Sequence, residues 1–451
     1  MTEEFTKHYG EGNIDGPEYN IEAIDSPQIR QYTRESITQV INEYPNLSGL
    51  GVSLGEGMKG WSGEQQVEWV KDVFFKGIHA ADRPIRFIYR AALSGTHELH
   101  RQTIEESGLD TPEHPIIVEL KFNGSHAFST TSLVSTHGGG TGSAYWADPA
   151  PEHHKMAWMM RNEDFYRLRW GEPDFIRSHI QQNGQEYVAG YFIGSENYIP
   201  AVDIFSVPDH PQATWDWAFE RQWLFYMQWG RLLYNPGLED AVFANAFNQR
   251  FAGNPGEAMT EAYKLASRNT QRIAGFFPFS WDFTLYTEGF MRFGNHLTIK
   301  DMLKNRTTDP DFVSIRDYGD GTGEFDAQMT PLDLATRIDA DNTRAMELVA
   351  AITTDDPTLQ SEIEDVKAWC HLGNYFADKL RAATAFNQGK KEEAVAHMEA
   401  AVEEWKSLIR VTESRFQPSS LGHMRNARGG MFHWKDYLDE VESEVEWIRQ
   451  Q

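Results

Sequence analysis

Short apolar runs alternate with segments of helical periodicity along the chain as far as residue 282. Runs of this kind, bounded by glycine or proline, predict buried strands, and the segments between them predict amphipathic helices. The predicted strands are 45–56, 84–90, 115–122, 187–196 and 275–282. The predicted helices are 27–43, 63–77, 96–107, 162–182, 215–233, 238–251 and 256–271. Strands that alternate with helices indicate a parallel sheet, so we expect an α/β fold.

Beyond about residue 330 the pattern changes to long amphipathic helices with no strand between them. These helices are expected over 331–352, 359–387, 392–414 and 434–450. We therefore predict two domains, an α/β domain over 1–325 and an all-α domain over 326–451.

Polar residues lie at or just beyond the carboxyl end of nearly every predicted strand. They are Glu56, Arg90, Lys121, His126, Glu196, Trp281 and Asp282. In a (β/α) barrel the carboxyl ends of the strands form the active-site face, so this placement predicts a TIM-type barrel. For Glu56 alone, a loop glutamate that faces water is the alternative.

Composition narrows the classes of partner. Aromatic residues make up 13% of the chain, which suits a cleft that stacks on sugar rings, although a large aromatic core is the alternative. The formal charge of −26 repels nucleic acid and anionic membranes, so neither is expected as a partner. Cys370 is the only cysteine, so no internal disulfide is expected. No metal-ligand spacing or phosphate-binding motif supports a metal or a cofactor, and none is predicted.

Four motifs resemble the bacterial α-glucuronidase-like glycoside hydrolases and their uncharacterised polysaccharide-degrading relatives. The motifs are Tyr44–Met58, Gly190–Glu196, Trp229–Pro236 and Ser280–Asp282. The resemblance implies a glycoside hydrolase that acts on an acidic or plant/algal polysaccharide, with an acid after the fourth barrel strand. If Glu56 takes that place, only roughly 45 residues precede its strand, whereas three βα units need roughly 90. We therefore expect a barrel that is incomplete because its first strands are missing from the N-terminus of a truncated chain. A barrel that is incomplete in itself, or an error in the strand count, is the alternative.

Glycoside hydrolysis requires two carboxyl groups, one that protonates the leaving oxygen and one that activates water or attacks the sugar. We assign Glu56 as the general acid, because an apolar strand end beside glycines can desolvate it. Glu196 is the predicted base or nucleophile, with Asp282 and then Asp203 held in reserve.

Substrate contacts are predicted from the remaining polar residues. Arg90, Lys121 and Arg231 are candidates for a carboxylate or sulfate of an acidic sugar, His126 for orienting it, and Trp281 for stacking on it. Salt bridges within the barrel are the alternative for Arg90 and Lys121. Bracing of its own helix is the alternative for Arg231, and a structural hydrogen-bonded histidine for His126.

Two other functions remain open from the sequence. One is a non-catalytic carbohydrate-binding protein that keeps a degenerate barrel cleft, and the other is a helical interaction module formed by 330–451. The first residues carry no hydrophobic signal segment, so the sequence as written predicts a cytoplasmic protein. A periplasmic or secreted protein is expected instead if an N-terminal segment is missing.

Overall fold

The computed structural model describes residues 25–54, 58, 60–91, 96–136, 144–161, 165–194, 202–279, 284–325, 328–420 and 430–451. The chain forms two compact units, which are described one at a time. Unit 1 comprises residues 1–122, 135–159 and 184–192, and unit 2 comprises residues 123–134, 160–183 and 193–451.

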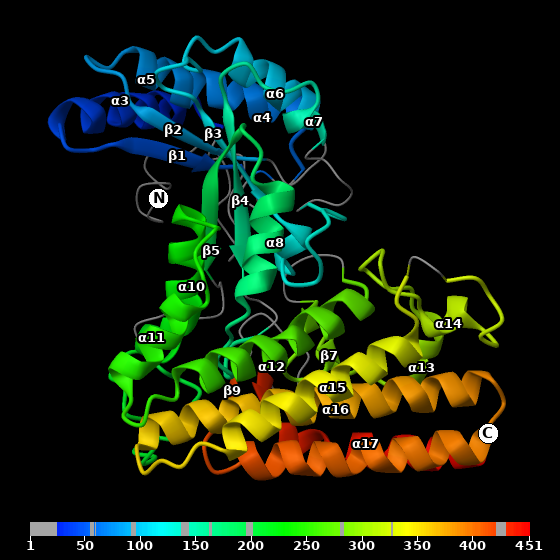
Figure 1. The fold of residues 1–451 in the computed structure, drawn as a ribbon. Helices are drawn as coiled ribbons and strands as arrows, with labels where there is room; N and C mark the ends of the chain where they lie inside the picture. Colours follow the sequence, from blue (N-terminus) through cyan, green and yellow to red (C-terminus); the bar gives the residue numbers. More distant parts are fainter. Residues whose placement is uncertain are drawn as a thin grey trace. The chain divides into compact units, whose positions relative to one another are not determined.

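A five-stranded sheet forms the centre of unit 1 (Figure 1). The strands are β1 (Gly49–Ser53), β2 (Arg86–Arg90), β3 (Ile117–Lys121), β4 (Lys155–Arg161) and β5 (Val188–Gly194). They lie in the order β1-β2-β3-β4-β5, and β1 to β4 pair in parallel. The predicted α/β fold with a parallel sheet is therefore confirmed. Among the described strands β1 and β5 are edges, so the sheet is not closed into a barrel.

Helices cover one face of strands β1–β3 (Figure 1). They are α3 (Pro27–Glu43), α4 (Gly63–Val70), α5 (Lys76–His79), α6 (His97–Glu105) and α7 (Ala144–Ala147), with a π-helical turn over Lys71–Phe75 that joins α4 to α5. Alternate residues of β2 point to this face, because side chains of a strand alternate in direction. Phe87 packs its ring 5.7 Å from that of Phe74 and 6.0 Å from that of Phe75. Tyr89 lies further along the same face, where its hydroxyl hydrogen-bonds Nδ1 of His100.

Residues of β2 that point to the opposite face are more exposed. Arg86 is exposed, Ile88 is 44% exposed and Arg90 is half-buried. Parallel sheets usually have both faces covered, so an exposed isoleucine in the middle of a strand is unusual. Arg90 and its register partner Glu119, near the carboxyl ends of β2 and β3, have their side chains on this face.

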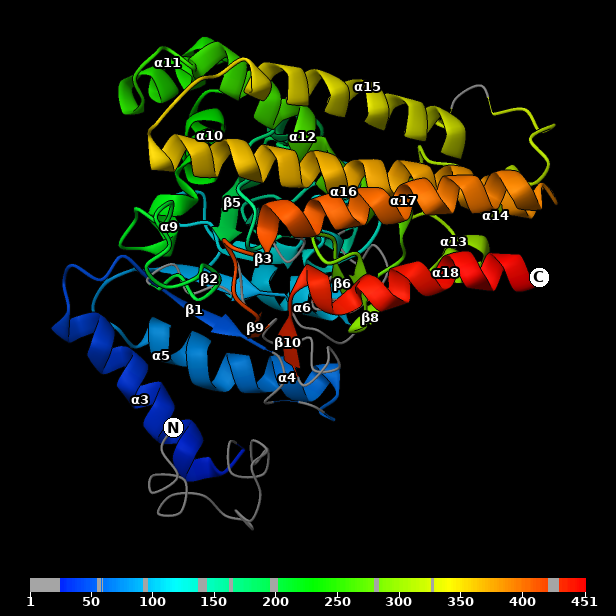
Figure 2. The ribbon, with the colours of Figure 1, turned by 90° about the horizontal axis from the view of Figure 1, so that it is seen from below.

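Unit 2 is mainly helical. Its helices are α8 (Pro173–Asn183), α9 (Ala218–Arg221), α10 (Trp223–Tyr234), α11 (Ala241–Arg250), α12 (Gly256–Phe276), α13 (Ile299–Lys304), α14 (Ile315–Tyr318), α15 (Pro331–Ala350), α16 (Pro357–Asn387), α17 (Lys391–Thr412) and α18 (Leu438–Gln450). The helices α15, α16 and α17 lie side by side, and α18 follows along α17 (Figure 2). Two small antiparallel sheets complete the unit, β6-β7-β8 (Leu285–Tyr286, Met291–Arg292, Asn295–His296) and β9-β10 (Ser419–Ser420, Met431–Phe432).

Aromatic side chains fill the core of unit 2. Phe128 is 1% exposed and contacts the rings of Trp170, Phe165 and Phe175 at centroid distances of 4.9, 5.3 and 5.5 Å. Much of the aromatic content therefore packs this core, as the alternative interpretation of the composition allowed. None of the helices in the described ranges combines the length and the apolar composition that a membrane crossing requires.

Two predicted elements are wrong. Residues 155–161 form strand β4, where the sequence pattern gave no strand, and the helix expected from 162 begins only at Pro173. The strand expected over 275–282 is not formed in its described part, because α12 continues to Phe276. The strand that leads to Glu196 is consequently the fourth after that of Glu56, one place later than predicted.

The predicted division into domains 1–325 and 326–451 stays a prediction. Within unit 2, α12, which precedes the predicted boundary, packs against both α15 and α16, which follow it. The described C-terminal region is nevertheless entirely helical apart from the short strands β9 and β10, as the amphipathic pattern predicts.

Candidate functional site

The carboxyl ends of the parallel strands define the first candidate site. Glu56 follows the last residue of β1 by three positions, and Glu196 follows the last residue of β5 by two. Both glutamates lie outside the described residues, as do Trp281 and Asp282. Their strands belong to one sheet, so the two chain segments leave the sheet from its two edge strands.

Arg90 lies at this carboxyl edge between two polar neighbours. In the register of the sheet it pairs with Ser53 on one side and with Glu119 on the other. Its Nε lies 3.7 Å from Oε1 of Glu119, and its Nη1 donates to Oγ of Ser53 over 3.4 Å. The side chain keeps 26% of its surface exposed. The salt bridge that was the alternative for Arg90 is therefore present, and the side chain of Arg90 is still partly exposed.

Lys121 and His126 are less accessible than predicted binding residues would be. Lys121, the last residue of β3, is 3% exposed. His126, in unit 2, is fully buried, and its ring centroid lies 4.6 Å from that of Phe279. Each has interactions within the protein, so their described environments resemble those of structural side chains.

The two remaining candidates lie apart from the strand ends. Arg231 is exposed in the last turn of α10, where a positive charge interacts favourably with the helix dipole. Asp203, the second reserve acid, accepts hydrogen bonds from the backbone N–H groups of Phe205 and Ser206 and from Nε1 of Trp215. Burial opposes its ionisation, but Arg221 and these donors outweigh burial and lower the pKa of Asp203. The ionised carboxylate is the form that a base or nucleophile requires, the role for which Asp203 is in reserve, but its oxygens are engaged by these donors.

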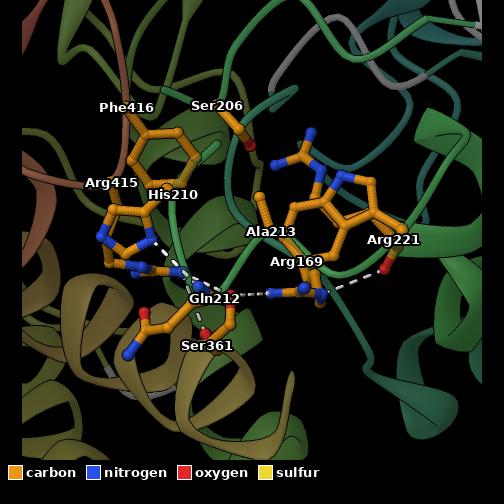
Figure 3. Close-up of a pocket in the computed structure, with 10 residues that line it drawn as sticks. Arg169, Ser206, His210, Gln212, Ala213, Arg221, Ser361, Arg415 and Phe416 are labelled. Atoms are coloured by element: carbon orange, nitrogen blue, oxygen red, sulfur yellow. Dashed lines mark hydrogen bonds between the residues drawn. The ribbon is translucent and has the colours of Figure 1, made fainter. Parts of the chain in front are cut away.

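A second candidate site, which the sequence did not reveal, is a small pocket in unit 2 (Figure 3). Three buried arginines, Arg169, Arg221 and Arg415, contribute to its wall, and we call it the arginine pocket. Its remaining lining residues are Ser206, His210, Gln212, Ala213, Trp215, Ser361 and Phe416. Its empty volume is about 220 Å³ including the open mouth, with room for about one ordered water molecule.

Asp365 of α16 holds two of these arginines from behind the pocket wall. Its Oδ2 accepts from Nη1 of Arg169 over 2.6 Å, and its Oδ1 accepts from Nη2 of Arg415. Burial opposes ionisation of Asp365, but Arg415 and Arg169 outweigh burial and lower its pKa. Ser361, one turn earlier on α16, accepts from Arg169 Nη1 over 3.1 Å and from Arg415 Nη2 over 3.0 Å.

Arg169 has further neighbours that fix its position. Its Nε donates to the carbonyl oxygen of Arg221 over 3.0 Å and lies 3.3 Å from Oε1 of Glu362. Its Cζ lies 4.8 Å from the ring centroid of Trp215, a distance typical of a cation–π contact. Burial raises the pKa of Glu362, and the charge of Arg169 only partly offsets this. The guanidinium is therefore held rigidly between α16 and the loop that carries Trp215.

The sequence gives little signal for this pocket. Arg169 is one of two arginines in the run Arg167–Trp170, and Arg415 occurs alone near the end of α17. Only the fold brings the two arginines to one carboxylate of α16. No group of three or more candidate metal ligands occurs among the residues that the structure describes.

Comparisons with known proteins support a fold relationship. A solved structure of a GH138 enzyme targeting pectin rhamnogalacturonan II is similar, with a TM-score of 0.72 and 15% sequence identity. The similarity covers 94% of this chain and 64% of that chain, so this chain spans less than two thirds of its length. At this identity the likeness shows the fold alone. A second structure, of CpGH84B, has a TM-score of 0.24 at 8% identity and carries no argument.

Sequence comparisons add no family. No protein-family model matches the chain. No curated protein matches it either.

Proposed function

We propose that this protein is a glycoside hydrolase that acts on an acidic polysaccharide of the pectin type. The observation that carries the proposal is the fold shared with a GH138 enzyme targeting pectin rhamnogalacturonan II, over 94% of this chain. The finer relationship to α-glucuronidase-like hydrolases is part of the same proposal and is supported by the motifs around Glu56 and Glu196. Pectin is an acidic plant polysaccharide, which agrees with the substrate class that these motifs imply.

In the proposed mechanism Glu56 protonates the leaving oxygen, and Glu196 activates water or attacks the sugar. Asp282 is the reserve for the second role. Retaining enzymes hold the two carboxyl groups about 5–5.5 Å apart, and inverting enzymes about 6.5–9.5 Å apart. Along a flat sheet, four spacings of about 4.8 Å would separate the ends of β1 and β5 by about 19 Å. The mechanism therefore needs a curved sheet, as in the incomplete barrel that we propose, in which β1–β5 would form part of the wall.

Two observations support an incomplete barrel of this kind. The five strands follow one another in sequence order across the sheet, which is the arrangement of consecutive strands in a (β/α) barrel. In addition, Ile88 is 44% exposed on the face that carries no helices of unit 1, the face that would point into a barrel. The barrel interior is normally filled by bulky branched side chains of this kind.

A second candidate function is carbohydrate binding without hydrolysis. It is favoured by the position of β1 and β5 at opposite edges of the described sheet, which would keep the two glutamates apart if the sheet were flat.

One experiment separates the two functions. The protein is incubated with a panel of pectic and neutral oligosaccharides, and new reducing ends are measured together with binding by calorimetry. Hydrolysis of an acidic oligosaccharide that is abolished in Glu196→Gln, with binding retained, supports the enzyme. Binding without new reducing ends in the unaltered protein supports the binding function and contradicts hydrolysis.

A further inference from the structure

We propose that the arginine pocket of unit 2 binds one small monovalent anion. The site is formed by Arg169 and Arg415 with Gln212 and His210 at the wall (Figure 3). The inference is independent of the proposed hydrolysis, because the residues that carry it are all described and none of them is a proposed catalytic residue.

Unsatisfied donors are the first argument. Arg169 is 1% exposed and Arg415 is 7% exposed, yet Nη2 of Arg169 and Nη1 of Arg415 have no hydrogen-bond partner within the described protein. Leaving a buried charged donor without a partner is costly, because the group loses its hydration and gains nothing in return. Both residues line the pocket, so an anion there would accept from both.

The distribution of charge is the second argument. The wall carries the guanidinium groups of Arg169, Arg221 and Arg415, and no carboxylate is among the described residues that line it. Three carboxylates pair with these arginines from outside the lining: Asp365 accepts from Arg169 and Arg415, Glu362 lies 3.3 Å from Nε of Arg169, and Asp203 lies 3.5 Å from Nε of Arg221. The guanidinium-bearing residues therefore line the pocket, while the carboxylates that pair with them are not among its lining residues. A preorganised set of guanidinium donors is well suited to an anion.

The size of the pocket is the third argument. The space suits about one water-sized particle, so it would take a halide or one oxygen of a carboxylate group but not a whole sugar ring. Either source supplies the same chemistry, one negative charge with acceptor lone pairs. Half-buried residues, among them His210 and Gln212, leave the mouth partly open to solvent, so exchange with dissolved anions is possible.

Bromide is the probe for the test. Crystals soaked in sodium bromide are expected to show an anomalous peak between Arg169 and Arg415. In solution, the unfolding temperature is expected to rise as bromide replaces the bulky anion isethionate at constant ionic strength. A ligand that binds only the folded state stabilises it in this concentration-dependent way. In a second arm D-galacturonate is added together with bromide. Displacement of bromide identifies a carboxylate as the natural ligand, and no displacement identifies an inorganic anion. Both results agree with an anion site.

Gln212→Glu is the main variant, because it places a negative charge at the pocket wall with almost no change in volume. It is expected to abolish the bromide-dependent shift. Arg415→Lys, which keeps the charge but loses the fork of donors, is expected to weaken bromide binding at least ten-fold. Arg344→Gln is the matched control, because Arg344 is an exposed surface arginine with 57% of its side chain accessible. The proposal is overturned if the unaltered protein responds equally to bromide and isethionate, or if Gln212→Glu responds as the unaltered protein does.

Discussion

Arg169 and Asp365 form a buried ion pair, in which Nη1 of Arg169 donates to Oδ2 of Asp365 over 2.6 Å. The side chain of Arg169 is 2% exposed and that of Asp365 is fully buried. The pair joins the segment before α8 to α16, which are distant in the sequence. The same carboxylate holds Arg415 beyond the end of α17, so one side chain of α16 fixes two other parts of unit 2.

Asp365→Asn is therefore expected to be strongly destabilising. It removes the carboxylate that the buried guanidinium groups of Arg169 and Arg415 share, leaving Glu362 beside Arg169, and breaking a buried pair typically costs about 3–5 kcal/mol. The free energy of unfolding, from urea titration, measures the effect. Glu347→Gln is the control, since the side chain of Glu347 is 61% exposed and its loss should change stability by no more than about 0.5 kcal/mol. Equal stability of the two variants would contradict the structural role of Asp365.

The buried carboxyl group of Glu172 should make the free energy of unfolding decrease as pH rises. Burial raises the pKa of Glu172 to about 7, with Arg268 opposing the shift, while its carboxylate accepts from the backbone N–H of Phe175 in the first turn of α8. The folded state thus binds the proton more tightly than the unfolded state. The resulting stabilisation is fully present below the unfolded pKa of about 4.5 and is lost as pH rises through about 7.

Glu172→Gln should remove this dependence. Relative to the variant, the unaltered protein is expected to lose on the order of 3 kcal/mol of unfolding free energy between about pH 4.5 and pH 8. Urea titrations at intervals across this range measure the difference. If the plots of unfolding free energy against pH are parallel for the two proteins, Glu172 does not titrate in this pH range.

Substitution of Arg90 tests whether the carboxyl ends of the strands bind an acidic sugar. Its partner Glu119 lies 3.7 Å away at a partly exposed position, so Arg90→Gln should change the unfolding free energy by less than about 1 kcal/mol. If the guanidinium of Arg90 binds a substrate carboxylate, the loss of a charge-assisted hydrogen bond should raise KM for an acidic oligosaccharide by about ten-fold or more. The kcat should not change, and KM for a neutral oligosaccharide should not change either. An equal rise in KM for both oligosaccharides would argue against carboxylate recognition by Arg90.

The parallel sheet could be predicted from the sequence, but β4 could not. The segment Lys155–Arg161 contains Met156, Ala157, Met159 and Met160, which are residues that favour helices. The residues Trp158, Met159 and Met160 are all buried, so the strand lacks the alternation of apolar and polar residues that identifies a half-exposed strand. Pairing with β3, which is a tertiary interaction, decides its conformation.

The error at the end of α12 has a different cause. Gly275 in the sequence Gly-Phe-Phe-Pro suggested a strand start, but it lies inside the helix. A Cβ atom there would meet the carbonyl oxygen of Ser129 at 2.7 Å, and the carbonyl of Gly275 accepts from the backbone N–H groups of Thr308 and Asp309. This glycine permits close packing of backbones, a requirement that a single sequence does not display.

The candidate sites were predictable to different degrees. Arg90 could be placed at a strand end because a strand pattern leads directly to it. The arginine pocket could not be predicted, because Arg169 and Arg415 come from separate segments that meet only through α16. Long-range contacts of this kind leave no local pattern in the sequence.

The rate at which the Glu56→Gln variant hydrolyses an acidic oligosaccharide tests the central proposal most directly. The initial rate of reducing-end release from an acidic pectic oligosaccharide is compared between the unaltered protein, this variant and the control Glu347→Gln. We expect the control to retain its activity and Glu56→Gln to lose at least about 10²-fold in kcat, as for removal of a general acid. Its unfolding free energy should stay within about 0.5 kcal/mol of the unaltered protein. Equal rates for Glu56→Gln and the unaltered protein would contradict the assignment of Glu56 as the catalytic acid.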